Sequence, residues 1–335
     1  VLLPTELWMS IFAYLAIEPH QVWWRILAEV SRHTNYSLKQ YFKRINFPRF
    51  KSSATISEDL ALEGHLSVLQ HVHENGARWS VTTPFSAAKH GHLSCLKYAH
   101  ENGCEWNELT CYYSALHGQL ECLQYAIEHG CEWTPNAILV AARKDHLGCL
   151  KYAWEGGCPR DIARKSWSDE GISIMSIAAC NGSIECVKYL FEQGVPWGDN
   201  LIKNIAKYGQ LNTLQYAIQE GCPFDRETIC SYAADDLECL IYLHEQGFPW
   251  GDASSIATLN GNVDCLRYIH EHGGTWSGDE ISIAYRHGSL PCLKYTFEHG
   301  CPVPTGLCGE QPHFTSQAIV DYAHTKVECT CHEYF

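Results

Sequence analysis

The sequence predicts an all-α protein, a solenoid built from short helical repeats. Three observations lead to this prediction: one phrase recurs at a nearly constant period, every copy holds two glycines at a fixed interval, and the residues between those glycines have helical periodicity. A length of 335 residues is equally compatible with two globular domains or with one extended array. The internal repeats favour the array.

The composition is that of a folded chain without a membrane span. Hydrophobic residues make up 46% and charged residues 19%, with 11 Trp and 18 Tyr, which is too apolar and aromatic for a disordered chain. Apolar stretches are interrupted by Lys, Glu or His well before the roughly 20 residues that a membrane-spanning helix needs. We therefore expect a hydrophobic core and no membrane partner.

Charge is distributed unevenly along the chain, whose formal net charge is -14. Residues 1–56 carry seven Lys and Arg against three Glu, which leaves 17 basic and 35 acidic residues, a charge of -18, on the remainder. An acidic surface of this size repels phosphate backbones. The sequence therefore predicts that the array does not bind nucleic acid.

The 18 cysteines lie within helical patterns of a long chain. The first residues lack the basic start and the small-residue cleavage site of a secretory signal, so a disulfide framework of the secreted type is not expected. We interpret the cysteines as reduced thiols of a cytosolic or nuclear protein.

The repeat is defined by two glycine positions. Units begin at Gly64, Gly91, Gly118, Asp145, Gly182, Gly209, Asp235, Gly261 and Gly288, mostly 27 residues apart. A second glycine follows each start by 12 residues, at Gly76, Gly103, Gly130, Gly157, Gly194, Gly221, Gly247, Gly273 and Gly300. The constant interval predicts one helix of about three turns, ended by the second glycine as a left-handed cap.

Each unit contains a second element in its variable interval. Within the constant interval, Leu or Val stands five residues after the unit start, and Cys and Tyr recur four and seven residues after it. The variable interval predicts a shorter helix with small residues near its end, as at Ala87–Ala88, Ala141–Ala142 and Ala178–Ala179. A helical pair of this size cannot bury its own apolar face, so we expect about ten units, the last one partial, to stack over residues 51–335.

The phrase from Ala87 to Tyr98, AAKHGHLSCLKY, resembles the helix-turn-helix of ankyrin repeats, in particular the shortened kind abundant in giant DNA viruses of amoebae. The period of 27 is shorter than the 33 residues of the ordinary repeat, and the Thr-Pro-Leu-His opening is absent. The resemblance implies an ankyrin-like α-solenoid that binds other proteins.

The first fifty residues form a separate segment. Leu7, Ile11 and Leu15 give one apolar stripe, and two further periodic runs follow, so three short helices are predicted in residues 1–50. This segment resembles an F-box, and the matching residues are Leu3, Pro4, Glu6, Leu7, Ile11, Tyr14, Leu15 and Val30–Arg32. That resemblance implies docking onto the Skp-type adaptor of a cullin-RING ubiquitin ligase through Leu3, Pro4, Leu7, Ile11 and Leu15. The alternative is a helical cap that only shields the first repeat.

An aromatic series lies three residues beyond the second glycine of most units. Its candidate partner-binding residues are Trp79, Trp106, Trp133, Trp197, Trp250 and Trp276, together with Arg160 at the equivalent place of one unit; Phe224 and Val303 complete the series. Two interpretations stay open. Each Trp wedges between adjacent repeats, or its edge lines a groove and anchors a partner peptide, as Trp does at interaction hot spots.

Neither cysteine nor histidine predicts catalysis or a metal site. The recurrent cysteines come from separate repeats and suit core packing. The most suggestive local group is Cys329, Cys331 and His332 with Cys308, His313 and His324 upstream, but its spacing matches no structural zinc pattern. The histidines lack the nucleophile and orienting carboxylate that catalysis requires. We expect no enzyme activity, cofactor or metal.

The two resemblances together imply a substrate receptor of a Skp/cullin-type ubiquitin ligase whose repeat array binds an unidentified target protein. Its expected location is the cytoplasm, the host cytoplasm if the chain is viral, or the nucleus. The first alternative is a non-enzymatic ankyrin-repeat scaffold or virion component in which the N-terminal helices serve only as a cap. The second alternative is a zinc-dependent protein, which chelation would destabilise.

Overall fold

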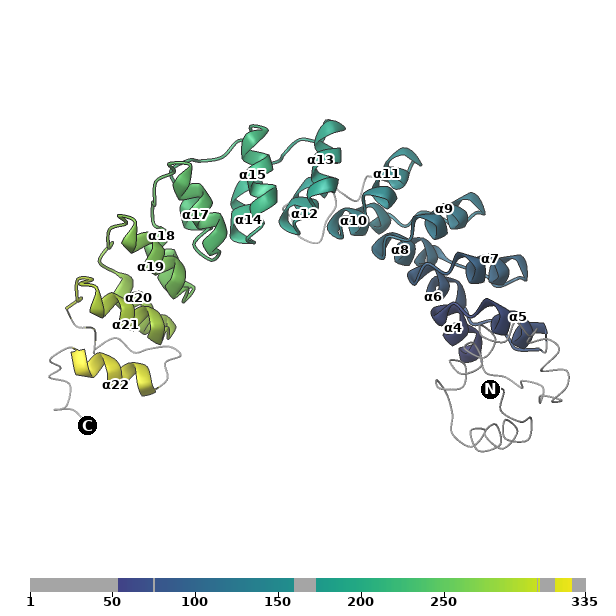
Figure 1. Cartoon of the computed structure of the whole chain (residues 1–335), viewed down its shortest axis with the longest axis horizontal. Helices are drawn as coiled ribbons and strands as arrows, with labels where there is room; N and C mark the ends of the chain where they lie inside the picture. Colours follow the sequence, from purple (N-terminus) through teal and green to yellow (C-terminus); the bar gives the residue numbers. More distant parts are fainter. Residues whose placement is uncertain (1–53, 75, 160–172, 306, 308–316, 327–335) are drawn as a thin grey trace, which may run out of the picture. The chain divides into compact units, whose positions relative to one another are not determined.

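The computed structural model of the chain describes residues 54–74, 76–159, 173–305, 307 and 317–326. Within these ranges the regular structure is helical and contains no β-strand, which confirms the predicted fold class there (Figure 1). The predicted helices of residues 1–50 lie outside the described residues. No described helix is long and apolar enough to span a bilayer.

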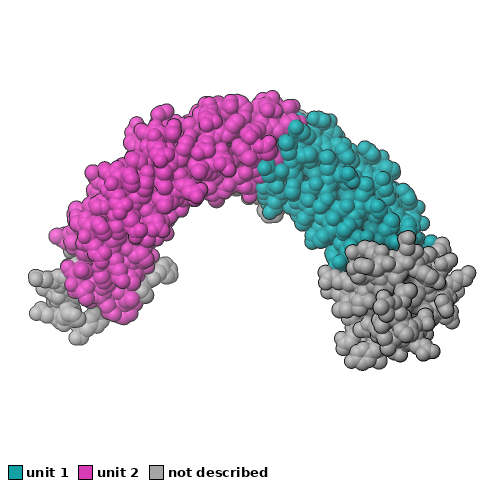
Figure 2. Space-filling view, in the orientation of Figure 1, with its two compact units in different colours: residues 1–167 teal, residues 168–335 magenta. Residues whose placement is uncertain are grey.

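The chain divides into two compact units, residues 1–167 and residues 168–335 (Figure 2). We call the helix between the two glycines of a repeat its constant helix and the helix before it its companion helix. In unit 1 the constant helices are α5 (Leu66–Glu74), α7 (Leu93–Glu101), α9 (Leu120–Glu128) and α11 (Leu147–Glu155). The companion helices are α4 (Ala54–Glu63), α6 (Thr83–Lys89), α8 (Glu108–Leu116) and α10 (Asn136–Arg143).

Unit 2 continues the same alternation. Its constant helices are α13 (Ile184–Glu192), α15 (Leu211–Gln219), α17 (Leu237–Glu245), α19 (Val263–Glu271) and α21 (Leu290–Glu298). The companion helices are α12 (Ile174–Cys180), α14 (Leu201–Lys207), α16 (Ile229–Tyr232), α18 (Ala253–Leu259) and α20 (Glu280–His287), and α22 (Gln317–Lys326) packs against α20 and α21. Every described constant helix has nine residues, about two and a half turns.

The second glycine ends the constant helix as predicted. In α7 the N–H of Gly103 donates to the carbonyl of His100 at 3.0 Å, and the N–H of Cys104 donates to that of Ala99 at 2.9 Å. Gly103 has a φ of 81°, the left-handed conformation that lets the chain turn back over the last carbonyls. All nine second glycines have φ between 75° and 94°, so the prediction of a left-handed cap is confirmed.

Small residues let the companion helices stack closely. Ala87 and Ala88 of α6 and Ala141 and Ala142 of α10 are fully buried, and α8 packs against both helices. Figure 1 shows α4, α6, α8 and α10 side by side in unit 1. Each companion helix also packs on the constant helix that follows it, as α6 does on α7. Two rows of helices therefore stack in register.

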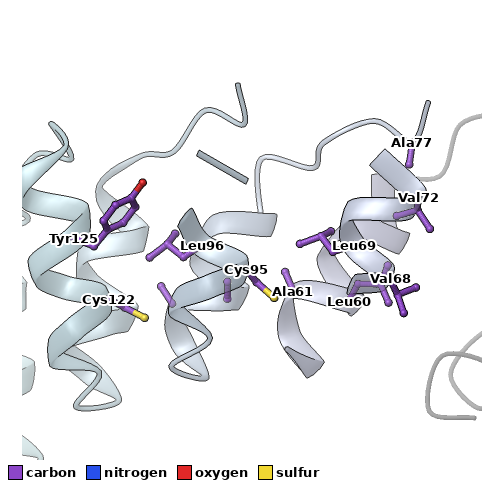
Figure 3. Packing of buried hydrophobic residues seen from close by; sticks show 12 residues of the cluster. Leu60, Ala61, Val68, Leu69, Val72, Ala77, Cys95, Leu96, Cys122 and Tyr125 are labelled. Atoms are coloured by element: carbon purple, nitrogen blue, oxygen red, sulfur yellow. The ribbon is translucent and has the colours of Figure 1, made fainter. Parts of the chain in front are cut away.

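The core lies between these two rows. The leucine five residues after the start of each repeat is fully buried in unit 1, as Leu69, Leu96, Leu123 and Leu150 show. Figure 3 shows Leu69 and Leu96 with Leu60 and Cys95 in the space between successive helical pairs. Burying a leucine side chain contributes about 2 kcal/mol, and each such contact joins one repeat to the next. The repeats are therefore held together by buried leucines that recur once in every repeat.

Candidate partner-binding surface

The aromatic series lies at the contacts between adjacent repeats. The indole of Trp79 stacks on the ring of His73 with centroids 4.2 Å apart and meets Tyr98 of the next repeat edge-on at 6.1 Å. Its Nε1–H donates to the carbonyl of Asn102 in that next repeat at 2.9 Å. Trp79 therefore connects one constant helix to the following one.

The same arrangement recurs in both units. In each case the aromatic or His ring nine residues after the first residue of a repeat stacks on the Trp of that repeat. The Tyr of the next repeat lies edge-on to both rings. The sets are His100, Trp106 and Tyr125; Phe191, Trp197 and Tyr216; His244, Trp250 and Tyr268; and His270, Trp276 and Tyr295. Edge-to-face and offset-stacked rings stabilise such contacts beyond the area they bury.

Most of these indoles keep part of their surface accessible. Trp197 is 8% exposed, whereas Trp79, Trp106, Trp250 and Trp276 are half-buried. Trp133, also half-buried, meets Tyr152 at 5.8 Å. An indole in this position can stabilise the repeat contact with one edge and present the other to a partner. The remaining candidate residues, namely Arg160 and the adaptor-binding set Leu3, Pro4, Leu7, Ile11 and Leu15, lie outside the described residues.

Histidines take part in the same contacts, a role that the sequence analysis did not assign. Nδ1 of His73 and the hydroxyl of Tyr98 are hydrogen-bonded at 3.1 Å, and the pairs His244–Tyr268 and His270–Tyr295 repeat this bond. Burial lowers the pKa of His73. The sequence contains a signal for this role, because in four repeats a His stands six residues before the Trp of the series.

A second set of histidines caps the constant helices. Nδ1–H of His129 donates to the carbonyl of Tyr125 at 2.8 Å, and His272 and His299 make the same bond four residues back. The same carbonyls also accept the backbone N–H of these histidines, so each carries two hydrogen bonds at the helix C-terminus. These bonds occupy Nδ1 of each ring.

The described cysteines form no disulfide with one another, and all of them except Cys180 are buried. Burial raises the pKa of Cys95, Cys122 and Cys149 to about 12, so these thiols are neutral at physiological pH. Cys131 donates from Sγ to the carbonyl of Asn107 in the preceding repeat at 3.2 Å. In the part of the chain that the structure describes, no group of three or more His, Cys, Asp or Glu side chains is arranged to hold a metal ion.

The family models that match the sequence agree with this architecture. Residues 111–200 match a family model of ankyrin repeats (three copies), and residues 85–127 match another of ankyrin repeats (many copies). The crystal structure of the human ASB11 ankyrin repeat domain is similar with a TM-score of 0.42 and 17% identity, covering 53% of this chain and 87% of that one. No curated protein matches the chain.

Residues 85–200 therefore contain ankyrin repeats, and the described helices form an ankyrin-repeat solenoid. Ankyrin repeats are protein-binding modules that are generally not enzymes. The array is a protein–protein interaction module.

Proposed function

We propose that this protein is a substrate receptor of a Skp/cullin-type ubiquitin ligase. The observation that carries the proposal is the order of two segments: residues 1–50, which resemble an F-box, precede ankyrin repeats that bind protein. In this division residues 51–335 form the array that holds the target. The receptor acts in the cytoplasm, the host cytoplasm if the chain is viral, or in the nucleus.

The adaptor contact is assigned to one apolar stripe. Leu7, Ile11 and Leu15 follow one another at intervals of four, which would place them on one face of the helix that the sequence predicts, and Leu3 and Pro4 precede that predicted helix. A stripe of this kind suits insertion into an apolar groove of a partner. We assign these five residues to the Skp-type adaptor.

The target contact is assigned to the array. Its half-buried tryptophans Trp79, Trp106, Trp250 and Trp276 are held in fixed orientations by their His and Tyr neighbours. A rigid aromatic edge loses little conformational entropy on binding, which is why Trp is frequent among residues that dominate interface energies. The protein performs no chemistry; it brings the target to the catalytic subunits, and proximity supplies the rate.

Affinity capture with the purified Skp-type adaptor tests the proposal. The full chain should retain the adaptor, and the double substitution Leu7→Asp plus Ile11→Asp should abolish retention while leaving the helical circular dichroism and thermal unfolding of the array unchanged. The matched control is Leu109→Asp plus Leu259→Asp, two leucines of the array that are each 40% exposed. This control should retain the adaptor.

Two results would count against the ligase role. Equal adaptor binding by the wild type and by the Leu7→Asp, Ile11→Asp variant would mean that the stripe is not the docking site. No binding by the wild type would favour the alternative, a scaffold or virion component whose N-terminal segment only caps the repeats.

A further inference from the structure

The companion helices of unit 1 end in a row of basic residues. Helix α6 ends at Lys89 with His90 as its C-cap residue, and the C-cap residues of α8 and α10 are His117 and Lys144. His90, His117 and Lys144 are exposed. Because α6 packs against α8 and α8 against α10, these ends occupy equivalent places in three neighbouring repeats. They form one continuous row.

An aromatic surface adjoins this row. The rings of Phe85 in α6 and Tyr113 in α8 stack with centroids 5.1 Å apart and 22° between their planes. Tyr113 also lies parallel to His117, with centroids 6.4 Å apart. Phe85 precedes Lys89 by four residues and Tyr113 precedes His117 by four, so each ring shares a helix face with a basic residue. Both rings are half-buried.

We call Phe85, Lys89, His90, Tyr113, His117 and Lys144 the basic-aromatic patch. Its two lysines are positively charged, and none of its six residues is acidic. Burial lowers the pKa of His117, and Lys89, His90, His146 and Lys144 lower it further, with no acidic group acting in the opposite direction. Among the described residues neither Lys89 nor Lys144 forms an ion pair. The exposed Glu63, at the equivalent place in α4, marks the end of the row.

Helix capping alone does not account for the row. A cation at a helix C-terminus is favourable because it opposes the partial negative charge there. The C-cap residues of α12, α14, α16 and α18, however, are Asn181, Tyr208, Ala233 and Asn260. The fold therefore tolerates an uncharged residue at the C-cap position. Three consecutive basic caps in a chain of net charge -14 call for another explanation.

We infer that the basic-aromatic patch receives an acidic segment of the target protein. Asp or Glu side chains of that segment lie against Lys89, His117 and Lys144, and an aromatic or aliphatic side chain covers the stacked Phe85 and Tyr113. The inference rests on the proposed function insofar as the array is the part that holds the target. Charge complementarity selects the occupant, since the array as a whole is acidic and repels an acidic segment, whereas this patch attracts it.

Fluorescence anisotropy with the full chain tests the assignment. The probe is a labelled synthetic peptide that alternates Asp or Glu with Phe or Leu, and its reference is the same peptide with Asn and Gln in place of the acids. We expect the acidic peptide to bind at least about tenfold more tightly and to lose affinity between about 50 mM and about 300 mM NaCl. Lys89→Glu plus Lys144→Glu should weaken its binding by at least about tenfold.

The matched control is Lys97→Glu plus Lys151→Glu, on the constant helices α7 and α11. This double substitution changes the net charge of unit 1 by the same amount as Lys89→Glu plus Lys144→Glu. It should stay within about twofold of the wild type. Thermal unfolding checks that both variants fold. Equal losses in both variants would show that only bulk charge matters and would overturn the assignment.

Two further results would also overturn it. A single-stranded oligonucleotide of equal charge that binds more tightly than the peptide would identify a general polyanion site. A dimer that dissociates in the Lys89→Glu, Lys144→Glu variant would identify a second copy of the chain as the occupant. Adaptor capture by the same variant separates this inference from the ligase proposal, because adaptor binding depends on residues 1–50 and should be unchanged.

Discussion

The ring of His100 lies parallel to the indole of Trp106, with centroids 3.7 Å apart and 5° between the planes. Tyr125 of the next repeat lies edge-on to both rings, 6.0 Å from His100 and 5.9 Å from Trp106. Trp106 thus contacts its own repeat and the following one. In a solenoid the contacts between neighbours supply much of the stability, so this ring is part of the framework whether or not a partner also binds it.

Replacement of Trp106 should destabilise the array. Trp106→Ala removes a half-buried indole and its contacts with two other rings, which we expect to cost about 2 kcal/mol of the free energy of unfolding. Urea unfolding followed by far-ultraviolet circular dichroism measures this loss. Leu109→Ala, at a leucine 40% exposed on α8, is the control and should change the free energy by less than about 0.5 kcal/mol. An unchanged stability of Trp106→Ala would mean that the ring serves a partner alone.

Acidification below neutral pH should weaken the repeat contacts. Burial lowers the pKa of His73, His92 and His100, and the nearby His129 lowers that of His100 further. A base whose pKa is lower in the folded state binds fewer protons there than in the unfolded chain. The stability is therefore full above about 6.5, the ordinary histidine value, and declines as the pH falls below it.

Urea midpoints between pH 7.5 and about pH 5.5 test this dependence. We expect the midpoint to fall across this window and the fall to be smaller in His100→Gln. Since burial is the first cause, about 0.5 M NaCl should leave the dependence in place. A flat profile, or one that salt abolishes, would contradict burial as its origin.

Much of the fold could be predicted because its signals are local. The spacing of Gly103 predicts where α7 ends. The recurrent positions of Leu96 and of the Ala87–Ala88 pair predict that these side chains are buried in the core. The six-residue interval between His100 and Trp106 is visible in the sequence, but their stacking depends on how the connection folds back.

Other features depend on the stacking register or on a local deletion. The contact between Phe85 and Tyr113 joins residues 28 apart and follows from how α6 and α8 pack, so no local pattern indicates it. Helix α16 is only four residues long, in a unit whose spacing is one residue short and whose start is Asp235 rather than Gly. The basic row at the helix ends likewise becomes a surface only when three repeats stack.

The start of one repeat leaves no space for a side chain, which predicts a coupled pair of substitutions. Gly118 has a φ of 72°, and a Cβ placed there would lie 2.6 Å from Nδ1 of His146 in the next repeat. The other ring nitrogen, Nε2 of His146, is bonded to the carbonyl of Leu116 at 3.1 Å, so the ring cannot move away freely. Gly118→Ala therefore combines backbone strain with a steric clash.

Gly130 is the matched control, because its φ is 90° but no atom lies within 4 Å of the added Cβ. Gly118→Ala should cost at least about 1 kcal/mol more than Gly130→Ala. In the His146→Ala background the additional cost should disappear, which a double-mutant cycle by urea unfolding measures. A coupling energy of zero would show that the ring of His146 does not restrict this position.

Glu280, the first residue of α20, is a fully buried carboxylate. Its Oε1 accepts from the N–H of Ser277 at 2.9 Å and from the hydroxyl of Ser254 at 2.8 Å, and its Oε2 accepts from the N–H of Gly278 at 3.0 Å. Burial alone would raise the pKa of Glu280, but the hydrogen bonds from Ser277 and Ser254 bring it below its ordinary value.

Glu280→Ala should cost about 3 kcal/mol of the free energy of unfolding, since it leaves two backbone N–H groups and one hydroxyl without an acceptor. Glu238→Ala, at an exposed Glu in the first turn of α17, is the control and should cost less than about 0.5 kcal/mol. Because the folded pKa is depressed, the stability that the carboxylate contributes is present above about pH 4.5 and declines as the pH falls through the folded pKa. Glu280→Gln keeps a neutral acceptor, so it should lose less stability than Glu280→Ala and should lack this acid-dependent component. If the two variants unfolded at the same urea concentration at pH 7, the hydrogen bonds to the side chain would not be the source of the stabilisation.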